Sequence, residues 1–265
     1  MPVPTTQAAV DFLFQNRAEA GKQLAEALSD LKGRDDVVVI GVPRGGVVVA
    51  SEVAAGLGAP LDIWVSAKLE LPGTTGSIGY VSEDGDRFVD EAAVARARIQ
   101  PAVLVSELHR QRQDVRRRAA LYRGDYPALD LHEKIVVVVD DGLATGATVR
   151  PVLLAVARSR PARCILALPV AAIQPLENMA DLVNERVALA TPPGFRSVAD
   201  YYMHFMQVRD ADVIQCVKAR RGEVDEPKGG KPLFDLQPGD SLDGMEMFFR
   251  SVHENHPPSD RTGNH

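Results

Sequence analysis

The most informative part of the chain reads Val136-Val137-Val138-Val139-Asp140-Asp141-Gly142-Leu143-Ala144-Thr145-Gly146-Ala147-Thr148. Four consecutive valines favour a strand that is buried on both faces, as in a parallel sheet covered by helices. The small residues after the two acids let the backbone approach a ligand. The N–H groups of such a loop, and of a helix that begins after it, present partial positive charge. The stretch therefore predicts a strand, a loop that binds a phosphate group, and a helix.

Two adjacent acids, Asp140 and Asp141, end the apolar run. Because an open parallel sheet binds its ligand at the carboxyl ends of its strands, both acids are candidate ligand-binding residues. Carboxylates do not grip a phosphate, but they suit sugar hydroxyls or a metal ion that bridges sugar and phosphate. The hydroxyls of Thr145 and Thr148 add hydrogen-bond donors to the loop. The alternative interpretation is a plain strand-to-helix turn in which the two acids cap the helix.

Short apolar runs elsewhere in the chain alternate with helix-compatible segments. Strands are predicted at Val37–Ile40, Leu61–Val65, Ile135–Val139 and Cys164–Leu168, with Arg186–Leu189 as a candidate fifth. Helices are predicted at Gly46–Leu57, Val149–Ala157 and Ile173–Asp181. This alternation indicates an α/β fold, with a parallel sheet and right-handed crossovers.

Two segments depart from the alternation. An insertion of about seventy residues separates the second and third predicted strands, which is too long for an ordinary crossover. Its first part has alternating runs at Ser77–Val81 and Arg87–Val89 around Asp84-Gly85, which predicts a hairpin on a mobile loop. Its second part, Pro101–Tyr122, predicts a long and mostly solvated helix. Residues 221–265 predict a linker and a partly ordered tail.

Composition excludes several classes of protein. A net charge of −6 argues against a nucleic-acid coat, and no apolar stretch reaches the roughly 18 residues of a membrane-spanning helix. Met1–Gln15 lacks a basic region followed by an apolar run, so we expect no secretory signal. Cys164 and Cys216 lie in apolar segments without metal-ligand spacing, which indicates free buried thiols. We therefore expect a cytoplasmic protein with no nucleic-acid or membrane partner.

Residues 136–149 resemble the motif of type I phosphoribosyltransferases that binds phosphoribosyl pyrophosphate (PRPP). Residues from about 10 to 217 are similar to a bacterial group described only as predicted phosphoribosyltransferases. The resemblance implies a parallel sheet with helices on both faces, a hairpin or flexible-loop insertion, and a small hood. It also implies Mg²⁺ as cofactor, with the ion held mainly through PRPP and in reach of Asp140 or Asp141.

The resemblance assigns roles residue by residue. Asp140 and Asp141 would hold the ribose hydroxyls. The 5′-phosphate would be cradled by the loop residues Gly142, Ala144, Thr145, Gly146, Ala147 and Thr148. Arg44, with Gly45 and Gly46 after the first strand, would bind pyrophosphate, because a guanidinium can chelate two of its oxygens. Lys68, after the second strand, would reach the same group.

The catalytic set implied by the resemblance is therefore Asp140, Asp141, Arg44 and Lys68. Residues 71–82 would form the loop that closes over PRPP. Relatives carry an acid near positions 75–77, where this chain has Thr-Gly-Ser, so no catalytic acid is carried over. Ala144 stands where 6-oxopurine enzymes have an aspartate, so the loop looks more like that of adenine or xanthine enzymes.

Three questions stay open at the level of sequence. Residues 1–220 should form the phosphoribosyltransferase domain, with a hood built from about 10–30 and 191–218. The aromatic residues Phe195 and Tyr202 either stack on a base or pack the hood. The arginines of the long helix either lie on a solvated face or reach an anion or a neighbouring subunit; they are Arg110, Arg112, Arg116, Arg117 and Arg118.

The predicted activity is transfer of the phosphoribosyl group of Mg-PRPP to an unidentified nitrogenous base, with release of pyrophosphate. The expected partners are PRPP and a small heterocyclic or amine acceptor, with a homo-oligomer left open. The alternative is a non-catalytic PRPP-binding regulator or sensor of the same fold.

Overall fold

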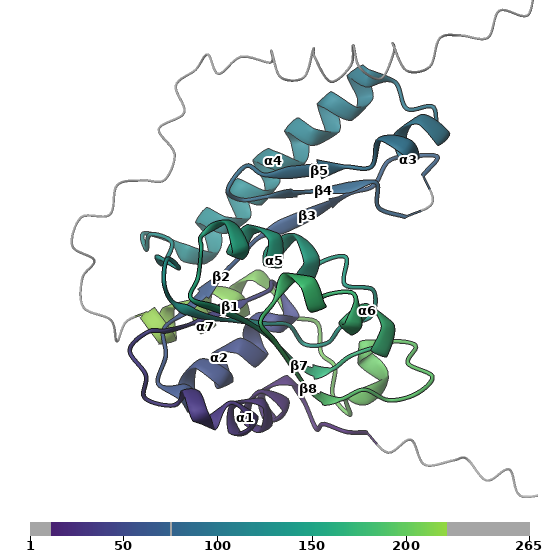
Figure 1. Ribbon diagram of the computed structural model, residues 1–265. Coiled ribbons are helices and arrows are strands. Elements are labelled where there is room, and N and C mark those ends of the chain that lie inside the picture. Colours follow the sequence, from purple (N-terminus) through teal and green to yellow (C-terminus); the bar gives the residue numbers. More distant parts are fainter. Residues whose placement is uncertain (1–11, 75, 222–265) are drawn as a thin grey trace, which may run out of the picture.

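The computed structural model describes residues 12–74 and 76–221. Its centre is a five-stranded parallel sheet with strand order β2-β1-β6-β7-β8 (Figure 1). The strands are β1 (Val37–Gly41), β2 (Leu61–Ile63), β6 (Ile135–Val139), β7 (Arg163–Val170) and β8 (Glu185–Ala190). All five predicted strands are present, the second of them shorter than predicted, and the α/β fold class is confirmed.

The order of the strands places a topological switch point between β1 and β6. From β1 the chain crosses to β2 on one side, and it later returns to β6 on the other side. The two strands are in register from Val37 opposite Ile135 to Gly41 opposite Val139, so both end at the same edge. Open parallel sheets bind ligands at such a point, because the two loops diverge there and leave a crevice.

Side chains of the central strands alternate between two hydrophobic cores. Val37 and Val39 face a core shared with α1 (Arg17–Ala27), α2 (Gly45–Leu57) and α7 (Asp210–Arg221). Val38 and Ile40 face a second core shared with α5 (Val149–Arg158). Since consecutive residues of a strand point to opposite faces, an unbroken valine run is what a sheet covered on both sides requires. Helices on both faces are thus confirmed.

The predicted helices appear with small shifts at their ends. The third of them, Ile173–Asp181, is divided into α6 (Ile173–Glu177) and a single 3₁₀ turn at Ala180–Leu182. Two further 3₁₀ turns lie at Ser29–Leu31 and Val198–Tyr201. None of the described helices combines the length and apolarity needed to cross a membrane.

The long insertion forms a second lobe that projects from the parallel sheet (Figure 1). Its antiparallel sheet consists of β3 (Ser66–Leu69), β4 (Gly79–Ser82) and β5 (Arg87–Val89), and its helices are α3 (Glu91–Arg96) and α4 (Pro101–Arg123). The predicted hairpin corresponds to β4 and β5, and the predicted long helix to α4. Helix α4 is only partly solvated. Leu104 and Leu108 enter the core of this lobe, and Val115 and Tyr122 enter that of the main sheet.

The predicted second strand was too long, and β3 was missed. β1 ends at Gly41, opposite Ile63, so the chain beyond Trp64 has no further partner in the parallel sheet. At Val65 it pairs with the hairpin instead: the Val65 N–H donates to Glu83 Oε2 at 2.7 Å, and the Glu83 N–H donates to the Val65 carbonyl at 3.0 Å. Lys68 therefore lies on β3, within the second lobe.

Buried charges connect the two lobes. Arg123 at the end of α4 contacts Asp62 of β2 at 2.8 Å and Glu83 of the hairpin at 2.5 Å, and Arg221 of α7 also contacts Asp62. Breaking one partner of such a buried network leaves an uncompensated charge, which is costly. This cluster fixes the base of the hairpin, and with it Lys68, against the main sheet. Of the predicted linker and tail, residues 221–265, Arg221 is the last residue of α7, and residues 222–265 lie outside the described residues.

Candidate functional site

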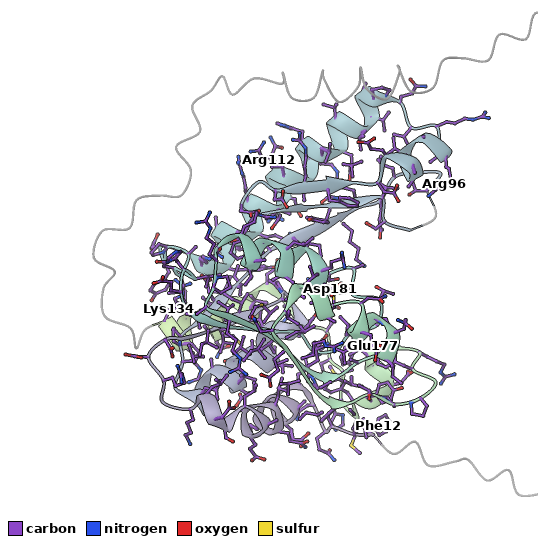
Figure 2. The ribbon with its side chains drawn as sticks, in the orientation of Figure 1. Phe12, Arg96, Arg112, Lys134, Glu177 and Asp181 are labelled. Carbon is purple, nitrogen blue, oxygen red and sulfur yellow. The ribbon has the colours of Figure 1, made fainter. Side chains whose placement is uncertain are left out.

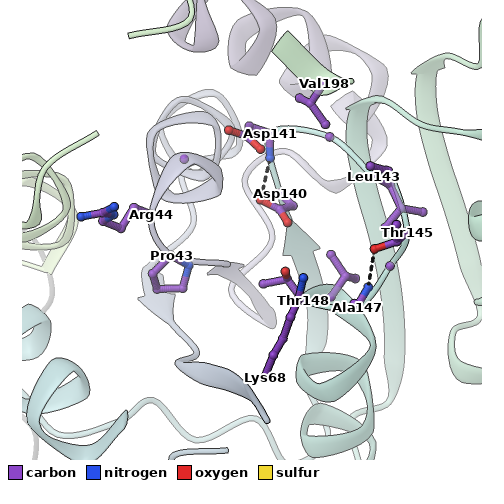
Figure 3. Close-up of a pocket in the computed structure, with 15 residues that line it drawn as sticks. Pro43, Arg44, Lys68, Asp140, Asp141, Leu143, Thr145, Ala147, Thr148 and Val198 are labelled. Atoms are coloured by element: carbon purple, nitrogen blue, oxygen red, sulfur yellow. Dashed lines mark hydrogen bonds between the residues drawn. The ribbon is translucent and has the colours of Figure 1, made fainter. Parts of the chain in front are cut away.

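A hollow of about 310 Å³ lies at the switch point between β1 and β6, within the size range of small-ligand sites (Figure 3). It is lined by Pro43, Arg44, Gly45, Lys68, Val198 and every residue from Asp140 to Val149. The structure thus brings together the two loops and the lysine that the sequence nominated from three distant segments. Gly46 stands behind the lining, where an added Cβ would lie 2.6 Å from Asp140 Oδ1.

Two helices begin at the edge of this hollow. α2 starts at Gly45 directly after β1, and α5 starts at Val149 after the loop that follows β6. The first N–H groups of a helix have no partner within the helix, and they carry the positive end of its dipole. The peptide bond between Pro43 and Arg44 is cis. Two helix N-termini converging on one hollow make a site suited to an anion with more than one phosphate group.

Glycine is required in both loops. Gly146 has φ +77°, and a Cβ there would also lie 2.4 Å from Met179 Cε. A Cβ on Gly45 would lie 2.0 Å from Asp141 Oδ2, inside van der Waals contact. The first glycine gives the phosphate loop its left-handed turn, and the second leaves room for the Asp141 carboxylate beside the α2 terminus.

The two acids of the motif occupy different environments. Asp140 Oδ1 accepts a hydrogen bond from the Asp141 N–H at 2.9 Å. Burial, and after it the charge of Asp141, raises the pKa of Asp140 well above its usual value, while the charge of Arg17 counteracts this. Perturbed carboxyls in a cleft are typical of functional sites.

Arg17, at the start of α1, is a site residue that the sequence did not reveal. Its Nε donates to Asp141 Oδ2 at 2.7 Å, and its Nη1 donates to the Met206 carbonyl at 2.7 Å. Its guanidinium carbon lies 3.7 Å from the centre of the Phe205 ring, a cation–π contact. The arginine therefore ties the second acid of the motif to both hood segments. No local signal marks this role, since Arg17 is 124 positions from its partner.

The hood packs on the backbone of the motif. The Tyr202 hydroxyl donates to the Asp141 carbonyl at 2.6 Å, and its ring lies 5.3 Å from Phe14 and 5.2 Å from Phe205. Tyr202 is 2% exposed, which favours packing over base stacking for this residue. Phe195 packs against Tyr201 at 5.2 Å. Within the predicted hood segment 191–218, residues 210–218 belong to α7 (Asp210–Arg221), which packs on α2, α4 and β2.

The side chains of Arg44 and Lys68 point in different directions. The Lys68 side chain extends from β3 toward the loop at Thr148, whereas that of Arg44 points away from Asp140 (Figure 3). Arg44 Nη1 lies 3.8 Å from Asp210 Oδ1 on α7, and both side chains are exposed. Among the described residues of the predicted closing loop, 71–74 and 76–82, none lines the hollow.

Most arginines of α4 follow the solvated interpretation. Arg110 pairs with Glu107 at 2.6 Å, and Arg117 and Arg118 pair with Asp114 at 2.7 and 2.9 Å. Such pairs within one exposed helix contribute little to stability.

An open parallel sheet with two helix N-termini and a carboxylate pair at its switch point is an α/β arrangement suited to a phosphorylated ligand. The chain belongs to the phosphoribosyl transferase domain family, whose model matches residues 10–184. This confirms the resemblance seen in the motif.

Similar proteins agree with this assignment. Two proteins of Mycobacterium tuberculosis, from strains CDC 1551 / Oshkosh and ATCC 25618 / H37Rv, bear the provisional name of phosphoribosyl transferase. Both are 39% identical to this chain over 204 residues, or 76% of its length. The chain spans 46% of the length of these relatives. The crystal structure of TT1426 from Thermus thermophilus is 39% identical, covers 78% of this chain and 98% of its own, and superimposes with a TM-score of 0.67.

Proposed function

We propose that the protein is a phosphoribosyltransferase that binds Mg-PRPP and transfers its phosphoribosyl group to a nitrogen atom of a small acceptor, releasing pyrophosphate. One observation carries the proposal: the pair Asp140 and Asp141 adjoins a small-residue loop at the N-terminus of α5, and both face a second helix N-terminus across the hollow. Sugar hydroxyls suit the carboxylates, and phosphates suit the two helix ends.

The residues divide between the parts of PRPP. The loop from Gly142 to Thr148 takes the 5′-phosphate, and Asp140 and Asp141 take the ribose hydroxyls. The N-terminus of α2 at Gly45, together with Lys68, takes the pyrophosphate. In this division, cationic and N–H groups bind the phosphates, and the two carboxylates bind the ribose hydroxyls.

In the proposed reaction the bond between ribose C1 and the pyrophosphate oxygen breaks, and its electron pair leaves with the pyrophosphate. A lone pair on the acceptor nitrogen forms the new bond to C1, and the nitrogen then loses its proton. Positive charge develops on the sugar ring, as in glycoside cleavage. The protein stabilises the departing charge with Lys68 and backbone N–H groups, and it holds the ribose in place.

The donors at the site fit Mg²⁺. Within residues 12–74 and 76–221, no three His, Cys, Asp or Glu side chains gather into a metal-binding group. Asp140 and Asp141 offer hard oxygen ligands to an ion that takes its other ligands from PRPP and water, the arrangement that Mg²⁺ prefers. The ion would supply positive charge to the leaving pyrophosphate.

A second candidate function is a PRPP-binding regulator without turnover. It is favoured by Ala144 in the place of an acid that could accept the acceptor's proton, and by the engagement of Asp141 with Arg17. Both candidates use the same ligand site, so turnover alone separates them. Neither candidate function identifies the acceptor or the oligomeric state.

Both cysteines are free thiols, which supports the cytoplasm as the expected compartment.

The test is a panel of nucleobases and small amines with Mg-PRPP, reading pyrophosphate release. Calorimetry of PRPP binding accompanies it, using the wild type and the double variant Asp140→Asn, Asp141→Asn. The control is Asp35→Asn, Asp36→Asn, which alters another adjacent aspartate pair outside the hollow. We expect PRPP binding in the wild type and the control and its loss in the first variant. Binding without pyrophosphate release would favour the regulator, and unchanged affinity of the first variant would refute the ribose assignment.

A further inference from the structure

A second, smaller cavity lies in the projecting lobe, between the hairpin and α4. Its volume is about 100 Å³, and it shares no residue with the hollow at the switch point. It is lined by Val81, Gly85 and Arg87 of the hairpin and by Val105, Leu108, His109 and Arg112 of α4. Three of these seven residues are basic and none is acidic, in a chain whose net charge is −6.

The acidic residues of the hairpin turn form salt bridges with an arginine that does not line the cavity. Asp84 and Asp86 flank Gly85, but both contact Arg158 of α5, at 2.6 and 2.7 Å. Arg158 thus holds both carboxylates, and neither of them forms a salt bridge with Arg87 or Arg112. Glu107 and Asp114 of α4 are likewise occupied, by Arg110 and by Arg117 and Arg118.

Two arginines that line the cavity are free of salt bridges to other described residues, and one has an unused hydrogen-bond donor. Within the described part of the chain neither Arg87 nor Arg112 makes a salt bridge, and the Nε of Arg112 is buried without a hydrogen-bond partner. Figure 2 labels Arg112 on α4. A Cβ on Gly85, where φ is +87°, would lie 3.3 Å from Arg112 Nη2, so the turn packs closely on the guanidinium. A buried donor without a partner costs free energy, which a bound anion would recover.

His109 adds a third donor. Its Nε2 lies 2.9 Å from Gln113 Nε2. An amide N–H can only donate, so the ring nitrogen accepts there and Nδ1 carries the ring proton in the neutral form. Arg116 lies one helical turn after Arg112, and its pKa is lowered by burial and then by the charge of Arg112.

We propose that this cavity is a second anion site, which binds the phosphate group of a small molecule. The size supports one group of this kind, since an apolar cavity of roughly 150 Å³ holds a single benzene molecule. Arginine forks match phosphate oxygens in pairs, and Val81 and Leu108 supply apolar lining beside the basic groups. The proposal does not depend on the function assigned to the hollow between β1 and β6.

The test follows the ring proton signals of His109 by NMR in the full chain during titration with inorganic phosphate, after assignment with His109→Gln. Ribose 5-phosphate, in a parallel titration, distinguishes a phosphate monoester from the free ion. Arg112→Gln removes the buried donor. Arg110→Gln is the matched control, because it makes the same charge change on the same helix at a residue paired with Glu107.

We expect a saturable shift of His109 in the wild type and in Arg110→Gln, with affinity lowered about tenfold in Arg112→Gln, the loss of one charge-assisted hydrogen bond. If Arg112→Gln does not fold, Arg87→Gln on the exposed edge strand takes its place. A His109 signal that does not saturate, or equal affinities in Arg112→Gln and Arg110→Gln, would overturn the proposal, since screening by surface charge would then explain the shift.

Discussion

Arg17 and Asp141 form a largely buried ion pair, with 10% and 15% of their side chains exposed and 2.7 Å between Nε and Oδ2. The pair joins the first helix of the chain to the loop after β6. It also offsets one of two adjacent carboxylates, of which the other, Asp140, has its pKa raised by burial and by its neighbour. Arg17 is therefore expected to stabilise the site before any ligand binds.

Replacing Arg17 with glutamine should lower the free energy of unfolding by about 1–3 kcal/mol, because a largely buried carboxylate loses its partner. Urea denaturation at neutral pH measures the loss. Arg17→Lys should recover part of it, because the charge remains while the fork geometry is lost. The control is Arg34→Gln, which removes the exposed partner of Asp36 and should change nothing measurable. Equal stabilities of Arg17→Gln and Arg34→Gln would contradict the role given to Arg17.

The parts of this fold that the sequence predicted are those set by local chemistry. An unbroken apolar run such as Val136–Val139 fits only a strand covered on both faces, and Asp140 to Thr148 carries its turn and helix start in its own residues. Family resemblance added the partner loop at Arg44 to Gly46. The structure then brought these segments to one edge, as parallel strands in register require.

The missed features depend on contacts between distant residues. Nothing near Arg17 in the sequence indicates Asp141, and nothing in Ser66–Leu69 indicates that this run leaves the parallel sheet to pair with β4. The end of β1 at Gly41 and the side chain of Glu83 decide that departure. The direction of Arg44 is set in the same way, by Asp210 on a helix at the far end of the described chain.

Gly45 and Gly46 should respond differently to alanine. A Cβ on Gly45 meets the Asp141 carboxylate and lies 3.0 Å from Arg17 Nε, so side chains must move. A Cβ on Gly46 meets the backbone, at 2.7 Å from Asp140 Cα and 2.9 Å from the Val139 carbonyl oxygen. We expect Gly45→Ala to weaken Mg-PRPP binding at least about tenfold and to cost less stability than Gly46→Ala, which should destabilise the fold by about 1–3 kcal/mol.

Calorimetry with PRPP and urea denaturation, applied to both glycine variants, separate the two effects. The variants serve as controls for each other, since they make the same chemical change at adjacent positions. A Gly45→Ala protein that binds PRPP like the wild type would show that the Asp141 carboxylate is not needed where the structure holds it.

Lys68 and Arg44 provide a test of where pyrophosphate binds. Lys68 extends into the hollow, so Lys68→Met should weaken pyrophosphate binding about tenfold and ribose 5-phosphate binding much less, because one charge-assisted contact is lost. Arg44→Ala should also weaken pyrophosphate more than ribose 5-phosphate if its guanidinium leaves Asp210 on binding. Titration calorimetry at low salt measures both ligands, with Lys22→Met on the exposed surface of α1 as the control. Equal losses for the two ligands would contradict the assignment of either residue to the pyrophosphate end.

Glu83 should make stability depend on pH in a direction unusual for a carboxyl group. It is buried beside Asp62 and accepts from the Val65 N–H, and burial raises its pKa to about 7 despite the opposing charge of Arg123. The pKa of Glu83 is thus higher in the folded state than in the unfolded state, where it is 4.5. Glu83 therefore contributes most to the free energy of unfolding below pH 4.5, and this contribution is lost as the pH rises through 7. The free energy of unfolding of the wild type, relative to Glu83→Gln, should therefore fall by about 3 kcal/mol across this interval. Urea denaturation between these pH values tests it. Glu107→Gln is the control, because the hydrogen bond from Arg110 lowers the pKa of Glu107, so its contribution to stability is present across this interval and is lost only at lower pH. If the difference in free energy of unfolding between wild type and Glu83→Gln stays constant with pH, the prediction is wrong. Arg123 would then keep Glu83 ionised, and the charged cluster between the two lobes would hold no extra proton.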